Sequence, residues 1–295
     1  MRSGRRKVSV GAFDGSTNRW MDVDAAGDVD RDELIVATYN IWFNDSFADQ
    51  RYQAIADLLS RDKPDIIVFQ EVTPAALTVF LAQSWVREHY RRAAVTGADV
   101  GNYGMLMLSR LPINRVTYTR LPTQLARGFL QAEFTINGRR QVVCAVHLES
   151  GKHASGLRAR QLRTVFRTLR GADDAVVLGD FNMRDSENDL IDSAYCDLWP
   201  TLRPGESGFT EDTSINLMRY DMKSKHRHVR FDRVLLNGTG WLGSSIDLLG
   251  TKPISDGLPR VFPSDHFGVL CRLRRRPSAV GDARRRWVLS QLRRG

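Results

Sequence analysis

Polar side chains that could hold a metal ion or a phosphate stand at the ends of several apolar runs. Asn40, Glu71 and His147 each close one run, and Asp180 and Asn182 close another. Each residue alone is typical of a turn or a cap. Together they are not explained by packing, because burying so many polar groups costs several kcal/mol unless a ligand or a metal satisfies them. The set therefore predicts a functional site.

Three further candidates lie in the C-terminal part of the chain. Asp232 lies inside an apolar run, and Asp265 and His266 open the last one. Glu71, Asp180 and Asp265 offer the hard oxygen ligands that Mg²⁺ and Mn²⁺ prefer. The sequence has no His/Cys cluster of the kind that binds zinc. The residue types therefore predict a site for Mg²⁺ or Mn²⁺.

The remaining polar groups are suited to a phosphate. Amide and imidazole donors can stabilise the negative charge that grows on a phosphate in the transition state, and the candidates are His147, His266, Asn40 and Asn182. Asp180 could orient and activate an attacking water. Asp232 could hold one ring nitrogen of a histidine so that the other faces the substrate. The combination indicates metal-assisted hydrolysis of a phosphoester.

A mixed sheet with a few helices must position these groups. Apolar and β-branched runs predict strands over residues 33–40, 65–72, 103–110, 128–136, 140–148, 175–181, 230–237 and 266–273. The Asn137-Gly138 turn predicts a hairpin, so part of the sheet is antiparallel. Helical spacing predicts helices over residues 45–59, 73–88 and 153–170. These elements predict an α/β sandwich in one domain over residues 33–274.

The composition excludes several classes of protein. Of the 295 residues, 42% are hydrophobic and 26% are charged, which is typical of a globular protein and not of a disordered or membrane-spanning chain. Residues 1–15 lack the apolar segment of a secretory signal. The three cysteines stand singly, without a Cys-x-x-Cys pair. We therefore expect an intracellular, cytoplasmic protein that does not bind membranes.

The charge is unevenly distributed. The net charge is +9, but residues 272–295 carry nine arginines and one acid, so the rest of the chain is nearly neutral. We expect residues 275–295 to form an Arg-rich tail, either solvated or in contact with a nucleic acid or a partner. Residues 1–32 are rich in Gly, Asp and Arg without periodicity, and we expect them to form a mobile leader.

Five motifs resemble the signature of the endonuclease/exonuclease/phosphatase superfamily. They occur in the family's order as Thr38-Tyr39-Asn40, Gln70-Glu71-Val72, His147-Leu148-Glu149-Ser150, Gly179-Asp180-Phe181-Asn182 and Ser264-Asp265-His266. The resemblance implies a DNase I-like, four-layered α/β sandwich, in which two packed mixed β-sheets are flanked by helices. It also implies a metal-dependent hydrolase of phosphoesters. Because the superfamily includes nucleases and phosphatases, the substrate stays open at this level.

Longer stretches are similar to the type-2 tyrosyl-DNA phosphodiesterases. They include residues 69–74, 147–150, 179–185, 230–234 and 262–268. Enzymes of that family cut the 5′-phosphotyrosyl bond that a trapped topoisomerase leaves on DNA, and they leave a 5′-phosphate. The resemblance implies DNA as the partner, as single strands or as 5′-end adducts. We expect the chain to act on it as a monomer.

The resemblance also implies a role for each candidate. Glu71 holds the metal, and Asn40 and Asp265 complete the shell of metal and phosphate ligands. The implied catalytic set is Asp180 and Asn182 for water and phosphate, His147 and His266 for the scissile phosphate, and Asp232 behind His266. Each of these positions carries a residue type competent for its role.

The substrate-binding loops match the family less completely. Tyr103 and Arg127 correspond to the family's single-strand DNA groove, and Arg184 could contact a DNA phosphate or be a surface residue. Glu211 stands where the family carries a Trp, a change that should weaken base stacking and repel phosphate. One alternative is a DNA endonuclease (abasic or non-specific) or a small-molecule phosphatase of the same superfamily. The other is a DNA-binding module without catalysis.

Overall fold

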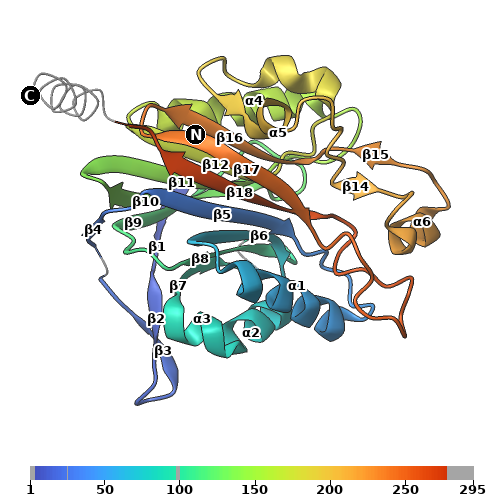
Figure 1. Cartoon of the computed structure of the whole chain (residues 1–295), viewed down its shortest axis with the longest axis horizontal. Helices are drawn as coiled ribbons and strands as arrows, with labels where there is room; N and C mark the ends of the chain where they lie inside the picture. The colour runs from blue at the N-terminus through green and yellow to red at the C-terminus, as the bar shows by residue number, and fades with distance from the viewer. Residues whose placement is uncertain (1–3, 25, 98–99, 278–295) are drawn as a thin grey trace, which may run out of the picture.

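Two eight-stranded sheets pack face to face in the computed structural model, which describes residues 4–24, 26–97 and 100–277 (Figure 1). The first sheet runs in the order β1 (Arg5–Val8), β9 (Arg115–Arg120), β10 (Gly128–Ile136), β11 (Arg139–His147), β12 (Asp174–Asp180), β16 (Asp232–Gly238) and β13 (Cys196–Asp197), and β4 (Asp28–Val29) pairs with β10. The second sheet runs in the order β17 (Trp241–Leu249), β18 (Gly268–Arg275), β5 (Glu33–Asn40), β6 (Ile66–Val72), β8 (Gly104–Ser109), β7 (Arg91–Val95), β2 (Gly11–Asp14) and β3 (Arg19–Asp22). Because β5 with β6 and β11 with β12 are parallel while their other neighbours are antiparallel, both sheets are mixed.

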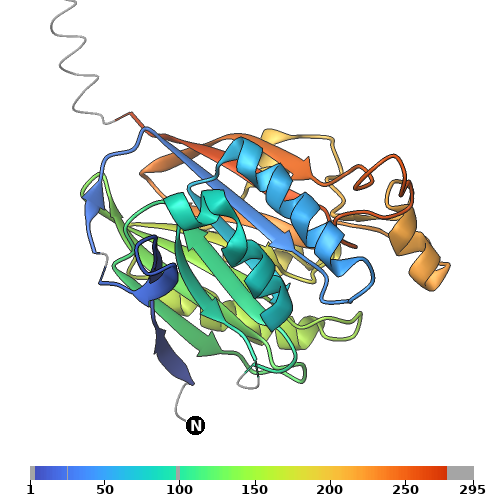
Figure 2. The ribbon, with the colours of Figure 1, turned by 90° about the horizontal axis from the view of Figure 1, so that it is seen from below.

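Helices cover the outer faces of the sheets. Figures 1 and 2 show α1 (Ala48–Asp62), α2 (Pro74–Ala82) and α3 (Ser84–His89) on the second sheet and α4 (Ser155–Leu169) on the opposite side of the molecule. The short helix α5 (Leu198–Leu202) packs against β16 and β17, and a 3₁₀ helix, η1 (Asp185–Leu190), follows β12. The order helix, sheet, sheet, helix confirms the four-layered α/β sandwich that the sequence predicts. Among the described residues, every helix is too short or too polar to cross a lipid bilayer.

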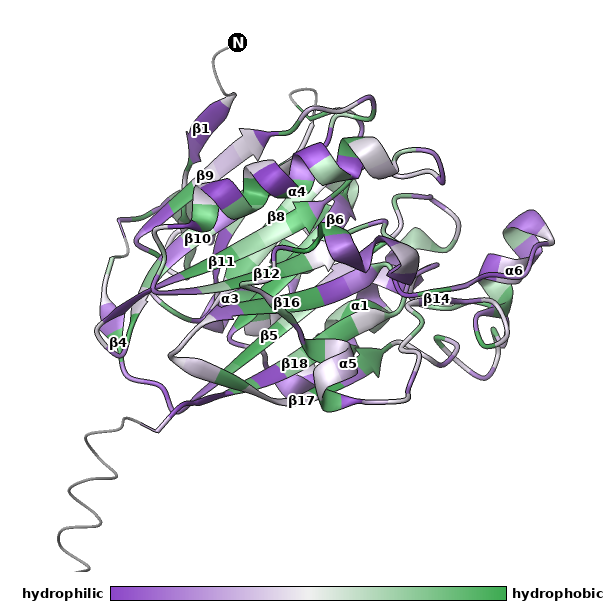
Figure 3. Ribbon diagram, turned by 90° about the horizontal axis from the view of Figure 1, so that it is seen from above, coloured by the Kyte–Doolittle hydropathy of each residue, from purple (hydrophilic) through white to green (hydrophobic). Residues whose placement is uncertain are grey.

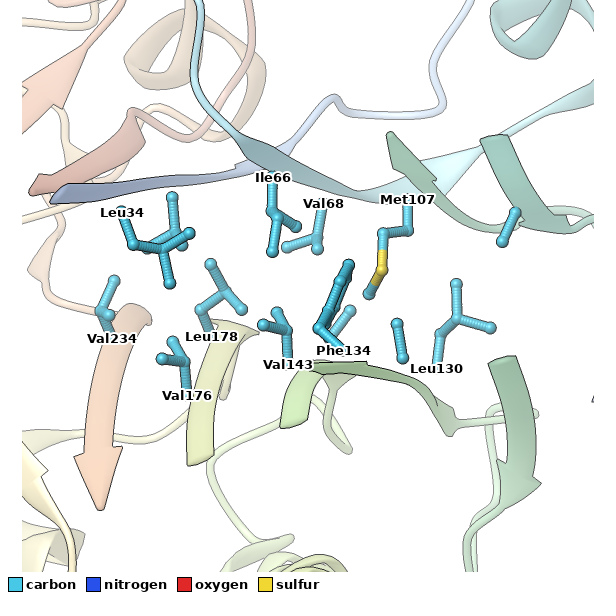
Figure 4. Close-up of a cluster of buried hydrophobic side chains, with 14 of the residues drawn as sticks. Leu34, Ile66, Val68, Met107, Leu130, Phe134, Val143, Val176, Leu178 and Val234 are labelled. Atoms are coloured by element: carbon cyan, nitrogen blue, oxygen red, sulfur yellow. The ribbon is translucent and has the colours of Figure 1, made fainter. Parts of the chain in front are cut away.

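Alternating side chains of the central strands enter different cores, because successive residues of a strand point to opposite faces. In β5, Leu34 and Val36 point between the sheets, whereas Tyr39 joins the cluster beneath α1 and α2. Figure 4 shows the inner core, where Leu34 and Ile66 of the second sheet face Val176 of the first. Burial on both faces explains why these strands appear in the sequence as continuous apolar runs.

Helix α4 covers the other face of the first sheet. Its residues Leu162, Val165 and Leu169 pack on β11 and β12, beside Val142 and Val177. Figure 3 shows hydrophobic and hydrophilic residues alternating along α4, as expected for a helix with one buried face. The apolar residues whose spacing predicts this helix from the sequence thus form the face that packs on the sheet.

The eight predicted strands are confirmed as β5, β6, β8, β10, β11, β12, β16 and β18. The helix predicted over residues 73–88 is divided into α2 and α3, because Gln83 has an extended backbone with ψ of 130°. Strands β7, β9 and β17 and the short helix α5 were not predicted. Their sequences are short or interrupted by polar residues, so periodicity alone does not reveal them.

The prediction of a mobile leader over residues 1–32 is wrong for residues 5–8, 11–14, 19–22 and 28–29, which form the strands β1 to β4. Strand β1 extends the edge of the first sheet beside β9, and the β2–β3 hairpin extends the second sheet beside β7. Val8 and Val10 are buried between the sheets. These strands have two to four residues and bury at most one residue each, so they leave no readable period in the sequence. Most of the predicted tail, residues 278–295, lies outside the described residues.

A small excursion leaves the sandwich between β13 and β16. It contains the two-stranded sheet of β14 (Glu211–Asp212) and β15 (His228–Val229) with the helix α6 (Leu217–Lys223) between them. In Figures 1 and 3 this excursion projects from one end of the molecule. The candidate residues meet at the base of this excursion.

Candidate active site

The predicted polar residues meet at one edge of the sandwich because of strand direction. In the first sheet, His147 and Asp180 end the parallel strands β11 and β12, and Asp232 begins the antiparallel β16 opposite Asp180. In the second sheet, Asn40 and Glu71 lie at the ends of the parallel strands β5 and β6. A hydrogen bond of 3.0 Å from Asn40 Nδ2 to Asp180 Oδ2 joins the two sheets at this edge. The structure thus brings together residues that are far apart in the sequence.

A β-bulge places Glu71. The pairing of β6 with β8 shifts register between Gln70 and Val72, and Glu71 has a φ of 62°. A positive φ is uncommon outside glycine, and a bulge re-aims a side chain relative to the strand. The Glu71 Oε2 atom accepts the backbone N–H of Phe43 at 3.1 Å. The bulge therefore orients the carboxylate toward the loop that follows β5.

Asp180 is buried and held by three donors. Its Oδ2 accepts Nδ2 of Asn40 and Nδ2 of Asn182 at 3.0 Å each, and its Oδ1 accepts the backbone N–H of Asn182 at 2.8 Å. Burial, with the charge of Asp232 adding to it, raises the pKa of Asp180 to about 6. A carboxylate with a pKa near neutrality is well suited to accept a proton from water.

His147 is held as a neutral imidazole. Burial and the neighbouring charge of Arg127 lower its pKa well below the usual value. Because a guanidinium can only donate, the 2.9 Å contact from Arg127 Nη1 requires that Nδ1 of His147 accept. The proton therefore sits on Nε2, which lies 3.4 Å from Asp180 Oδ2 and 3.9 Å from Glu71 Oε1. His147 thus presents an N–H donor to the two carboxylates.

His266 has the opposite protonation state. Burial lowers its pKa, but the charges of Asp232, Asp265 and Asp180 outweigh burial and raise it well above the usual value. Its Nδ1 lies 2.8 Å from Asp232 Oδ2. This pairing leaves Nε2 as the nitrogen that can face a substrate, as expected for Asp232 behind the histidine. Ligand atoms of Asp180, Asp232 and His266 lie within 4.8 Å of one another. With its pKa raised in this way, the His266 ring offers an N–H donor at Nε2 and not a ligand atom.

Glu71 and Asp265 have the electrostatics of a cation site. Burial, followed by the charge of Asp265, raises the pKa of Glu71 to about 7. Burial likewise raises the pKa of Asp265. Both side chains are mostly buried, and the charge of Asp265 disfavours ionisation of Glu71; a divalent cation with oxygen ligands would satisfy both carboxylates. The donor set therefore fits the predicted Mg²⁺ or Mn²⁺, while Asn40 uses its side chain to bind Asp180 and the backbone N–H of Trp42.

Tyr103 and Arg127, which the resemblance assigns to a single-strand DNA groove, lie beside His147. Arg127 Nη1 donates to the Tyr103 hydroxyl at 3.1 Å, and the Tyr103 and His147 rings are 6.0 Å apart. On its other side, the Tyr103 ring stacks on Phe43 with centroids 4.7 Å apart and planes at 24°. Phe43 is a site residue that the sequence analysis missed. The available signal was the aromatic pair Trp42-Phe43 directly after Asn40.

Arg184 lies at a basic cavity next to the central residues. This cavity, of about 310 Å³, is lined by Lys152, Asn182, Arg184, Lys225 and Arg227, together with Ser150, Gly151 and Phe231. Four cations from three chain segments thus face one space that includes Asn182. Arg184 shares this cavity with Asn182, so the structure brings it near the site.

Glu211, which the sequence analysis expects to weaken base stacking and repel phosphate, has its charge neutralised inside the protein. Glu211 is buried, its Oε1 binds Nε of Arg219, and its Oε2 accepts Nη1 of Arg227 at 2.9 Å. Arg219 in turn lies 3.7 Å from Oδ2 of Asp265. The carboxylate is therefore neutralised by two arginines that the sequence does not mark as partners, because they come from α6 and the segment before β15.

A buried arginine holds the loops that carry the site. Arg51 of α1 donates through Nη1 to the carbonyls of Ile41 at 3.1 Å and Pro263 at 3.3 Å, and its guanidinium lies 4.5 Å from the Trp42 ring. It thereby connects the loop after Asn40 with the loop before Asp265. Sequence reasoning missed Arg51, since arginine in a helix is usually exposed.

The comparison with family models identifies one match. Residues 37–266 match the model of the Endonuclease/Exonuclease/phosphatase family. All the predicted catalytic and metal-binding residues fall within this range.

Comparison with characterised proteins and solved structures agrees with this match. Tyrosyl-DNA phosphodiesterase 2 of Rattus norvegicus is 29% identical over 239 residues, which cover 76% of this chain and 62% of the rat protein. The human enzyme of the same name is 27% identical, over 76% of this chain and 63% of its own length. The chain thus matches less than two thirds of the length of these two relatives. A crystal structure of D. rerio TDP2 with a single-strand DNA product superposes with a TM-score of 0.73 at 24% identity, covering 82% of this chain and 99% of that one.

Proposed function

The chain belongs to the Endonuclease/Exonuclease/phosphatase family, and on that premise we propose that it is a divalent-metal-dependent phosphodiesterase. Its proposed substrate is a 5′-phosphotyrosyl bond, or a related 5′-end adduct, on DNA, and its product is a 5′-phosphate. The observation that supports the proposal is the arrangement of side chains at one edge of the sandwich. Two carboxylates suited to binding a cation, those of Glu71 and Asp265, lie there beside two imidazoles and Asp180, whose carboxylate is suited to act as a base.

Asp180 would activate the attacking water. Its pKa of about 6 makes it largely ionised at neutral pH yet basic enough to take a proton. The amides of Asn40 and Asn182 fix the orientation of its carboxylate. With the base held, the water can be directed at phosphorus in line with the leaving group.

The two histidines would stabilise negative charge on the phosphate. His147 is neutral and donates from Nε2, whereas His266 is cationic and is oriented at Nδ1 by Asp232. Donors that are fixed before the reaction stabilise the developing charge without reorganising. His147 therefore stabilises the phosphate as a neutral donor, and His266 stabilises it as a cation.

Glu71 and Asp265 would hold the divalent ion, which when bound supplies Lewis-acid stabilisation of the phosphate and the leaving oxygen. Glu71 is oriented by its bulge and by the Phe43 N–H. Asp265 is followed by the backbone N–H of His266, which donates to Ser264 Oγ at 3.2 Å, and Ser264 Oγ donates to the Asn40 carbonyl at 2.7 Å. These contacts connect the segments that carry both carboxylates to residues 40–43.

The basic cavity and the similar proteins support DNA as the substrate. Lys152, Arg184, Lys225 and Arg227 line a space that also contains Asn182, where the phosphates next to the scissile bond could bind. The rat and human relatives are tyrosyl-DNA phosphodiesterases, and the D. rerio structure contains a single-strand DNA product. Neutralisation of Glu211 removes the repulsion that the sequence alone suggests.

The test is hydrolysis of a single-stranded oligonucleotide that carries a 5′-phosphotyrosyl group. We expect a 5′-phosphate product with Mg²⁺ or Mn²⁺ and none with EDTA, and we expect Asp180→Asn to lower the rate by about 10²–10⁴-fold. A supercoiled plasmid and a small phosphomonoester serve as parallel substrates. Metal-dependent nicking of the plasmid, or release of phosphate from the small substrate, without cleavage of the tyrosyl bond would replace this proposal by an endonuclease or a phosphatase.

A further inference from the structure

An exposed aromatic ring stands at the entrance to the candidate site. Phe43 is 45% exposed, although its loop is held firmly on both sides. Its own N–H donates to Glu71 Oε2 at 3.1 Å, and the preceding Trp42 is buried against Arg51. The backbone between Asn40 and Phe43 therefore directs Trp42 inward and Phe43 outward.

The Phe43 ring stacks on one aromatic neighbour, and almost half of the residue is exposed to solvent. This neighbour is Tyr103, whose ring lies near His147 and whose hydroxyl accepts from Arg127. Exposed hydrophobic residues are common on protein surfaces, and most need no explanation. Phe43 differs because its ring stacks on Tyr103 and its backbone N–H donates to a candidate metal ligand, Glu71.

We propose that the outer face of Phe43 is a stacking subsite for a flat aromatic ring of the substrate. This inference rests on the proposed function, because a 5′-phosphotyrosyl end carries two such rings near phosphorus: the phenol of the leaving tyrosine and the base of the terminal nucleotide. Both have π-faces that stack on phenylalanine.

Stacking contributes enough to be measured. Removing an aromatic side chain that stacks on a base costs about 1–3 kcal/mol, which corresponds to roughly a 5- to 150-fold loss of affinity. The loss must depend on the presence of the ring in the ligand. A loss that is the same with and without that ring indicates only a disturbed loop.

The experiment measures binding of fluorescent single-stranded oligonucleotides in EDTA, which prevents turnover. Three ligands are compared: a 5′-phosphotyrosyl end, the same end on an abasic terminal nucleotide, and a 5′-phosphate end with its base. The variants are Phe43→Ala, Phe43→Leu and Phe43→Trp, and Phe47→Ala is the matched control. Phe47 lies in the same loop and is 46% exposed.

We expect Phe43→Ala and Phe43→Leu to weaken binding of the 5′-phosphotyrosyl oligonucleotide by about tenfold, whereas Phe43→Trp and Phe47→Ala bind like the wild type. If the loss persists on the abasic ligand but disappears on the 5′-phosphate, the stacked ring is the phenol. If it persists on the 5′-phosphate but disappears on the abasic ligand, the ring is the terminal base.

Equal affinities of Phe43→Ala and wild type for all three ligands would overturn the subsite. An equal loss on all three ligands, or the same loss in Phe47→Ala, would also overturn it. Hydrolysis by the wild type is assayed separately with Mg²⁺. If the wild type does not hydrolyse the substrate but the loss of binding depends on the ring, the proposed function is refuted and the subsite remains. If the wild type hydrolyses the substrate but the loss of binding does not depend on the ring, only the subsite is refuted.

Discussion

Replacing Glu211 by Gln tests whether this carboxylate is a buried structural anion or a surface charge that faces DNA. Gln keeps the shape and removes the charge that neutralises Arg219 and Arg227. Removing one partner of a buried ion pair costs about 3–5 kcal/mol, because it leaves an uncompensated charge. Asp265 still lies 3.7 Å from Arg219, and Arg227 is partly solvated. We therefore expect a loss at the lower end, about 3 kcal/mol of unfolding free energy.

Urea unfolding followed by circular dichroism measures this loss as a shift of the midpoint at constant slope. Asp247→Asn is the control, since Asp247 pairs with Arg203 on the surface and should lose less than about 1 kcal/mol. DNA affinity is measured on the same proteins. If Glu211→Gln is as stable as the control and binds DNA more tightly than the wild type, Glu211 is an exposed, repelling anion and the reasoning from burial is refuted.

Two further predictions follow from the protonation states of the site. The pKa of Glu71 is raised to about 7, so the protonated group stabilises the metal-free protein below its ordinary pKa, and this stability is lost as the pH rises toward 7. Mg²⁺ or Mn²⁺ should therefore raise the melting temperature more at about pH 8 than at about pH 5. An equal rise at both pH values in calorimetry would contradict a shared cation site. Asp232→Asn removes the strongest of the charges that raise the pKa of His266 against burial. The imidazole should then lose its proton at lower pH, and the alkaline limb of the kcat profile should also move to lower pH. An unchanged limb, or an unchanged NMR titration of His266, would show that Asp232 does not hold the proton.

Much of the fold could be predicted because its central strands are buried on both faces. Continuous apolar runs such as residues 66–69 and 142–146 mark strands with little ambiguity, and the polar residues that end them mark the site edge. The N-terminal strands could not be predicted, because an edge strand of four residues is held mainly by main-chain hydrogen bonds to β9 or β7. Main-chain pairing is nearly independent of side-chain identity, so it leaves no pattern.

The identities of the candidate site residues were determined by the sequence itself. Carboxylates, amides and imidazoles at strand ends, in the order of a known family, indicate metal-dependent phosphoester chemistry before any coordinates are known. This works because the chemistry requires particular functional groups, and a strand end is a position that the apolar pattern reveals.

Only the tertiary structure decided the protonation state and the exposure of each candidate site residue. Whether His147 is neutral and His266 cationic depends on burial and on Arg127 and Asp232, which reach them from other parts of the chain. Whether Glu211 repels phosphate depends on two arginines from the excursion that contains α6. Charge, burial and exposure result from through-space neighbours, and the spacing of residues along a chain does not specify which neighbours these will be.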